Sequence, residues 1–108
     1  MLLEVPVMAI PNQKLTTELN AQNCQIQLRQ IGPALMCSLS VDDQVVFYNS
    51  ICGNHARVGQ FKSNLFSGAL FFVDTLGDTD PYYDGLGTRY KLFYASEDDP
   101  LYAKVDSV

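Results

Sequence analysis

The residues best suited to catalysis or metal binding are Cys52 and His55, three positions apart in Cys-Gly-Asn-His. The pair could share a zinc ion, but the only other thiols are Cys24 and Cys37. Both of these fall at apolar positions of alternating segments, where a cysteine usually acts as a small core residue. As a nucleophile with His55 as base, Cys52 lacks an evident orienting group or oxyanion loop. We therefore expect no catalytic residue, no metal site and no cofactor.

A second cluster is the acidic segment 74–85, in which four carboxylates fall within eleven residues. Such loops can hold Ca²⁺, but this one has no Glu at the twelfth position, and Pro81 removes a backbone donor. Asp80 and Asp84, as a glycosidase pair, lack a cleft in so small a chain. The favoured interpretation is a solvated hairpin loop, because Asp and Gly dominate turns. A small β-sandwich that binds carbohydrate or Ca²⁺ through this loop is the alternative.

Aromatic residues are the third feature: six Tyr and six Phe, with no Trp. They could stack the bases of single-stranded nucleic acid, but the basic groove that such binding requires is missing from the sequence. Tyrosine also supplies contact area at protein interfaces at low entropic cost. We therefore predict that the aromatic residues serve the core and protein contacts. The candidate interface residues are Tyr82, Tyr83, Leu86, Leu101 and Tyr102.

Charge and hydropathy narrow the function further. The net charge is −5, with four acidic and four basic residues in 1–73 but eight acidic and three basic residues in 74–108. An acidic chain without a basic stripe is not expected to bind DNA or RNA. The apolar runs are far shorter than a membrane span requires. The opening residues have no basic region and meet Pro6 early, unlike a secretory signal, so we expect cytoplasmic synthesis and reduced thiols.

The elements that must position these residues are predicted to be strands, because apolar residues recur with period two between turn signals about ten residues apart. Pro6 lacks a ladder donor and places the first strand at an edge. Segment 44–49 is apolar on both faces in its middle, which indicates a central strand or one covered by a partner. The expected strands are residues 3–9, 15–19, 24–29, 35–41, 44–49, 68–73 and 89–94.

The predicted fold class is all-β: a small single-domain β-sandwich or partly open β-barrel of about seven to eight mostly antiparallel strands. Residues 1–96 are expected to form this domain, with a long loop over 50–67 that contains one short strand or helical turn. Regular structure is expected to end with the acidic run that begins at Glu97. Residues 97–108 would then be an acidic tail, docked on the domain or on a neighbouring subunit because Leu101 and Tyr102 are costly to leave in water.

Two stretches resemble the small baseplate plug proteins of contractile-tailed bacteriophages. Residues 5–13, followed by 15–28, are similar to that family's opening hairpin with its Pro-Asn-Gln turn. Residues 70–74, the acidic loop and residues 81–94 are similar to its closing unit, whose hallmark is a Tyr-Asp-x-Leu-Gly turn before a strand. The middle of the chain matches only in pattern.

This resemblance implies a structural virion protein, a plug-like component of the tail baseplate that acts by protein–protein assembly and has no catalytic activity. Its partners would be other tail and baseplate proteins, such as hub, tube, spike or wedge components. A homo-oligomer within the assembly is compatible with the same role. The protein would be made in the host cytoplasm and reside in the virion.

Overall fold

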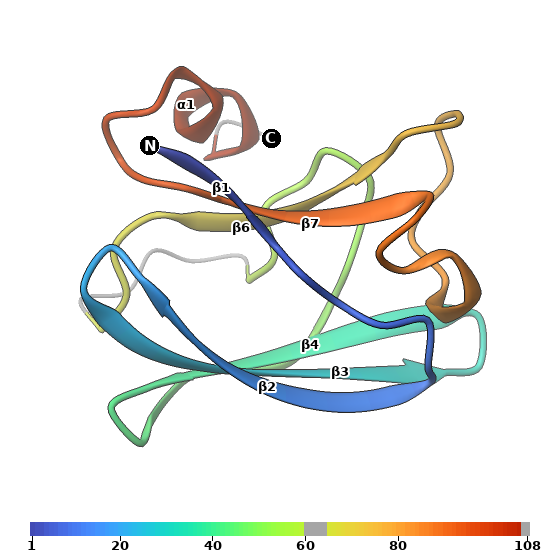
Figure 1. Cartoon of the computed structure of the whole chain (residues 1–108), viewed down its shortest axis with the longest axis horizontal. Coiled ribbons are helices and arrows are strands. Elements are labelled where there is room, and N and C mark those ends of the chain that lie inside the picture. The colour runs from blue at the N-terminus through green and yellow to red at the C-terminus, as the bar shows by residue number, and fades with distance from the viewer. Residues whose placement is uncertain (60–64, 107–108) are drawn as a thin grey trace.

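The computed structural model describes residues 1–59 and 65–106. Seven antiparallel strands in this part form two facing sheets, with the orders β1-β7-β6 and β2-β3-β4-β5 (Figure 1). The predicted all-β sandwich is confirmed, and it is open rather than a closed barrel. The elements are β1 (Leu2–Val5), β2 (Asn12–Leu19), β3 (Gln22–Ile31), β4 (Ala34–Val41), β5 (Gln44–Ile51), β6 (Ala69–Asp74), the 3₁₀ turn η1 (Tyr83–Gly85), β7 (Tyr90–Ala95) and α1 (Pro100–Asp106).

The four-stranded sheet follows from alternation and from two tight turns. Inward side chains of β3 and β4, such as Ile26 opposite Leu39, are fully buried between the sheets. Asn20–Ala21 and Asp42–Asp43 join the hairpins, and all four of these residues have positive φ angles. Two consecutive positive φ angles are typical of the type I′ turn, whose twist matches that of paired strands. Local sequence therefore sets the register of this sheet.

The three-stranded sheet needs cover on both of its faces. In β6, Leu70 and Phe72 belong to the core between the sheets, whereas Ala69 and Phe71 belong to a second cluster on the outer side. Helix α1 lies over that outer side (Figure 1). This double burial explains why β6 is almost continuously apolar. The first strand is an edge strand, as expected, and it ends at Val5 because the next residue, Pro6, has no N–H to donate.

Strand β5 is not a central strand. It lies at the edge of the four-stranded sheet, next to β4. Its register against β4 shifts twice, so both Val46 and Phe47 pack against the core, and strict alternation is lost. The apolar run 45–48 reflects these bulges, so the interpretation as a central strand was wrong; cover by a partner remains the open alternative.

The end of the chain also differs from the prediction, because α1 follows the acidic run. Pro100 is the first helical residue, a position where the missing N–H costs nothing. The Asp99 carboxylate accepts a hydrogen bond from the Leu101 N–H at 2.9 Å and so caps the helix. Asp-Pro here starts a helix, which corrects the prediction that regular structure ends with the acidic run. No helix of the described residues is long and apolar enough to cross a membrane.

The predicted loop over 50–67 begins later than expected, because β5 continues to Ile51, and its other described residues, 52–59 and 65–67, contain isolated bridges and no further strand or helix. Asn54 pairs with Phe72 and Arg57 with Phe71, both along the outer edge of β6. The His55 N–H donates to the Phe72 carbonyl at 2.8 Å. Phe61, also part of the predicted loop, lies outside the described residues.

Candidate functional site

Cys52 and His55 occupy different environments. The Cys52 side chain is buried in the core, while His55 is exposed. Contact with the Cys37 thiol, together with burial, raises the pKa of the Cys52 thiol far above its ordinary value. Burial likewise raises the pKa of Cys24 to about 11. Since the thiolate is the nucleophile and the metal ligand, these protonated thiols are poorly suited to either chemistry.

The best-organised polar cluster centres on Asp74, at the end of β6. Its carboxylate is buried and forms a bidentate pair with Arg89, with Nε to Oδ1 and Nη2 to Oδ2 both at 2.8 Å. It also accepts the Leu76 N–H at 2.9 Å, and the N–H and hydroxyl of Thr79 at 2.9 and 3.0 Å. The Asp74 carboxylate thus links the start of the acidic loop to Arg89, which follows the loop.

This arrangement sets the electrostatics of the loop. The Arg89 guanidinium holds the pKa of Asp74 well below its usual range, and the donors on Thr79 and Leu76 add to the effect, against the opposing influence of burial. The Asp74 carboxylate would have to give up Arg89 to bind a cation. Within residues 1–59 and 65–106, no group of three or more His, Cys, Asp or Glu side chains is placed to hold a metal ion.

Three other carboxylates of the loop, those of Asp78, Asp80 and Asp84, are exposed. Asp80 accepts the Asn54 N–H at 3.0 Å, which ties the loop to the segment after β5. The Thr79 hydroxyl lies 2.8 Å from the Tyr90 hydroxyl. The acidic loop is therefore held against its neighbours at several points and presents its remaining charges to solvent.

Three of the five candidate interface residues lie in the turn that follows. Tyr82 is 39% exposed and its ring centroid is 5.0 Å from that of Tyr83, which packs partly on the core. The Tyr83 N–H donates to the Gln30 side chain at 3.1 Å and so joins this turn to β3. Leu86 is only 1% exposed, so its side chain supports the turn from inside the core.

Close packing explains the two glycines of this turn, Gly85 and Gly87. A Cβ at Gly87, where φ is +84°, would lie 2.4 Å from the Val7 carbonyl oxygen. A Cβ at Gly85 would lie 2.7 Å from the Tyr90 ring. Both contacts are closer than atoms of a side chain tolerate. The turn can therefore pack this tightly only with glycine at these two positions.

The other two candidates, Leu101 and Tyr102, lie on α1 at a separate place. Both are half-buried against a cluster formed by Ala69, Phe71 and Ala95. The Arg57 guanidinium carbon lies 5.4 Å from the centre of the Tyr102 ring, a cation–π distance. The structure does not bring the five candidates together into one surface.

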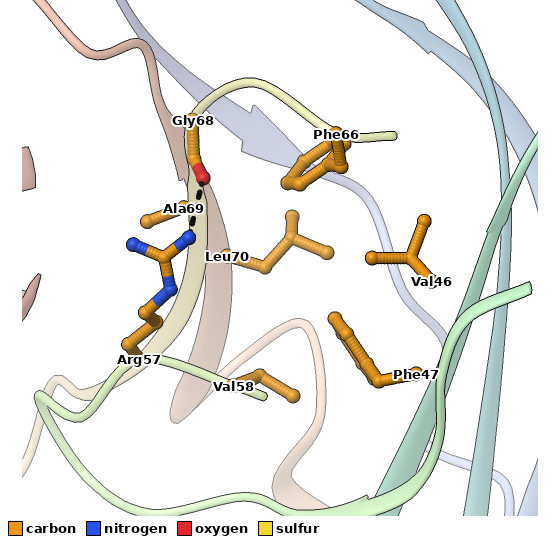
Figure 2. Close-up of a pocket in the computed structure, with 8 residues that line it drawn as sticks. All are labelled: Val46, Phe47, Arg57, Val58, Phe66, Gly68, Ala69 and Leu70. Carbon is orange, nitrogen blue, oxygen red and sulfur yellow. Dashed lines mark hydrogen bonds between the residues drawn. The ribbon is translucent and has the colours of Figure 1, made fainter. Parts of the chain in front are cut away.

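A small hollow lies between the sheets near β5 and β6 (Figure 2). The Arg57 guanidinium donates to the Gly68 carbonyl at 3.1 Å beside it. The enclosed space is about 10 Å³, room for about one water molecule. A sugar would not fit. The hollow is lined by Val46, Phe47, Arg57, Val58, Phe66, Gly68, Ala69 and Leu70.

Sequence reasoning missed Arg89 and Thr79, which organise the acidic loop. Arg89 is fifteen residues from Asp74 and was interpreted only as the start of a strand. The sequence showed only a single basic residue shortly after an acidic loop, which is weak evidence that this residue forms an ion pair with the loop. Charge alone could not tell which carboxylate it contacts.

Comparison with known proteins adds the decisive observation. The family model for the cyanophage baseplate Pam3 plug gp18 matches residues 2–97, from β1 to just beyond β7. No curated protein matches the chain. The match covers far more than half of the sequence and confirms the resemblance of its opening and closing segments to baseplate plugs. The chain therefore belongs to the cyanophage baseplate plug family and is a structural component of a phage tail baseplate, located in the virion tail.

Proposed function

We propose that the protein acts without catalysis, as a plug-like part held in place by contacts with neighbouring hub, tube, spike or wedge proteins. The observation that carries this proposal is the family match over residues 2–97. The protonated, buried thiols and the pairing of Asp74 with Arg89 agree with it, because they leave these groups engaged in structure. Synthesis in the host cytoplasm, before incorporation into the tail, belongs to the same proposal.

The surface we favour for these contacts is the acidic-aromatic corner, defined as Asp78, Asp80, Tyr82 and Asp84. All four side chains are exposed, and the loop that carries them is held by the bonds of Asp74. A surface that is ordered before binding loses little entropy on association. Tyrosine is enriched in interfaces, and acidic groups favour a basic partner patch. The expected partner surface is therefore rich in Arg or Lys.

Helix α1 gives a second, smaller contact. Its described residues pack on β6, and Leu101 and Tyr102 remain partly exposed there. We propose that residues 1–96 act as the β domain and that the tail 97–108 adds contact area at this side. Tyr83 contributes by packing its ring against that of Tyr82, and Leu86 contributes by anchoring the turn in the core.

Complementation of a phage that lacks this gene tests the proposal. The measurement is the amount of this protein in purified particles, relative to a major tail protein, by quantitative immunoblot. We expect the unmodified chain in particles and about tenfold less of a Tyr82→Ala, Asp78→Asn, Asp84→Asn variant, as for loss of an interface hot spot. The matched control, Glu18→Gln with Asp43→Asn, removes the same charge from exposed sites outside both proposed contacts and should assemble normally.

Recovery of the unmodified chain only from the soluble lysate would contradict a structural role in the tail. Equal incorporation of the corner variant and the control would leave the tail role intact but remove the acidic-aromatic corner as its contact surface. Circular dichroism of each purified variant distinguishes a lost contact from a lost fold.

A further inference from the structure

Strand β5 carries an apolar stripe on the outside of the sandwich, defined as Val45, Tyr48 and Ile51. Their exposed fractions are 61%, 66% and 64%. Isolated exposed apolar residues are ordinary on protein surfaces, but three along one strand are a contiguous feature. The stripe is far from the acidic-aromatic corner in sequence and contains no charged residue.

The two bulges of β5 create this stripe. On β4, Ser40 and Met36 face outward, and they pair with Val45 and Ile51 respectively. Between these pairs, Phe47 opposite Leu39 and Ser50 opposite Cys37 face inward. One extra residue on each side of Tyr48 changes the outward spacing on β5 from two to three.

Asn49, with a φ of +49°, forms the second irregularity, and its N–H donates to the Ser38 hydroxyl at 2.9 Å. This bond fixes the backbone directly beside Tyr48. The outward position of Tyr48 is thus part of the bulged backbone of the strand.

Among the described residues, the other sheet edges are protected and β5 is not. The outer edge of β6 is bridged by Asn54 and Arg57, and β1 is four residues long and followed by Pro6. The exposed side chains of β2 include Lys14 and Glu18. Short length, Pro and charge are the devices that keep edge strands from pairing. The eight residues of β5, Gln44–Ile51, contain no charged residue and no proline.

We propose that the apolar stripe binds the same stripe on a second copy of this chain, with the two strands antiparallel about a two-fold axis at Tyr48. Val45 and Ile51 lie three residues on either side of Tyr48, so this arrangement sets Val45 of each copy against Ile51 of the other. A two-fold contact requires such self-complementarity. The order apolar, aromatic, apolar reads the same in both directions.

Charge limits where a second copy can approach. Two chains of net charge −5 repel each other, and an uncharged strand is where they approach at least cost. In the antiparallel arrangement the turns at Asp42–Asp43, which precede β5, lie at opposite ends of the contact. A parallel arrangement would bring the four carboxylates together. The proposal does not depend on the baseplate role, because it concerns the isolated chain.

Single-cysteine cross-linking tests the geometry. The three native cysteines are buried, so an added surface cysteine is the accessible thiol. Copper–phenanthroline with oxygen removes two electrons and two protons from each thiol pair and forms the disulfide. We expect Tyr48→Cys to form several-fold more covalent dimer than Leu76→Cys, a site on the acidic loop that is more exposed than Tyr48. Val45→Cys alone should not cross-link above that control, whereas a mixture of Val45→Cys and Ile51→Cys should.

Equal cross-linking of Tyr48→Cys and Leu76→Cys would overturn the proposal, and so would efficient self-cross-linking of Val45→Cys. The mass of the chain without an added cysteine, measured by analytical ultracentrifugation, gives an independent readout. Three side chains are few beside the roughly 20–30 residues on each side of a stable interface, so the dimer should be weak and depend on concentration. Tyr48→Lys should abolish the rise in mass at high concentration, and Leu76→Lys should not. If the measured mass is that of a monomer at every concentration, self-association is refuted, and the stripe would then contact another protein.

Discussion

The two sheets of the sandwich present opposite outer faces. The outer face of β6 and β7 is apolar and covered by α1, so that Phe71 and Ala95 are buried (Figure 1). The outer face of the four-stranded sheet carries polar side chains such as Gln25, and its most exposed apolar residues are those of the stripe on β5. The chain thus covers one apolar face with its own C-terminal helix and leaves a narrower one exposed. Covered apolar area contributes to folding, whereas exposed apolar area is available to another chain.

Truncation of one aromatic residue on each face should give the largest contrast. Phe71 is buried and stacks on Phe93 with ring centroids 5.8 Å apart, so Phe71→Ala should lower the free energy of unfolding by about 3–5 kcal/mol. Tyr48→Ala, on the exposed face, should change it by no more than about 0.5 kcal/mol. Urea unfolding at low protein concentration measures both. Similar losses for the two variants would mean that the faces are not energetically different.

Acid should act on the sheet with the covered face, through Asp74. Its pKa in the folded protein is lowered from 3.8, so the carboxylate contributes stability that is fully present above that value and is lost as the pH falls below it. Urea midpoints between pH 7 and pH 3 should therefore fall less steeply for Asp74→Asn, which is also less stable at pH 7. Asp84→Asn, at an exposed site, serves as the control.

An unchanged pH dependence in Asp74→Asn would show that the ion pair with Arg89 does not govern acid stability. Some acid sensitivity should persist in this variant, because a hydrogen bond from the Ser96 hydroxyl also lowers the pKa of Asp98. Hydrogen exchange would locate the effect: amides of β6 and β7 should lose protection before those of β3 and β4.

The smallest of the three effects is expected at the helix that covers the outer face. Leu101 is half-buried, so Leu101→Ala should cost about 1–2 kcal/mol, less than truncation of a fully buried leucine. Thermal unfolding measures this loss. The control, Leu76→Ala, removes the same atoms from a side chain that is 78% exposed and should leave the melting temperature unchanged. If the two substitutions have the same effect, α1 does not contribute to stability as cover.

Much of the fold could be predicted because it rests on local patterns. The alternation of β3 and β4, together with Asp42–Asp43, specifies strands, buried faces and a hairpin within a few residues of one another. The turn around Gly85 and Gly87 was identified only through the resemblance to baseplate plugs, because the contacts with Val7 and Tyr90 that require its glycines arise in the folded chain. The place of β5 could not be predicted, because a bulged edge strand and a central strand share the same apolar run.

The candidate site was predicted less well. Tyr82 is exposed as expected, but Leu86 is in the core, because alternation does not show which side of a turn faces solvent. The role of Arg89 depends on a partner fifteen residues away. Asp99 and Pro100 were misinterpreted because the same residues that terminate strands also begin helices, and the choice depended on an apolar face for α1 to cover.

The sequence by itself determined the all-β class, most of the strands, their tight turns and the likeness to baseplate plugs, because period-two alternation and turn chemistry act over a few neighbouring residues. Only the tertiary structure decided that β5 is an edge, that α1 covers β6, and that Arg89 engages Asp74. These features join residues far apart along the chain, and burial and pairing between them exist only once the two sheets have packed.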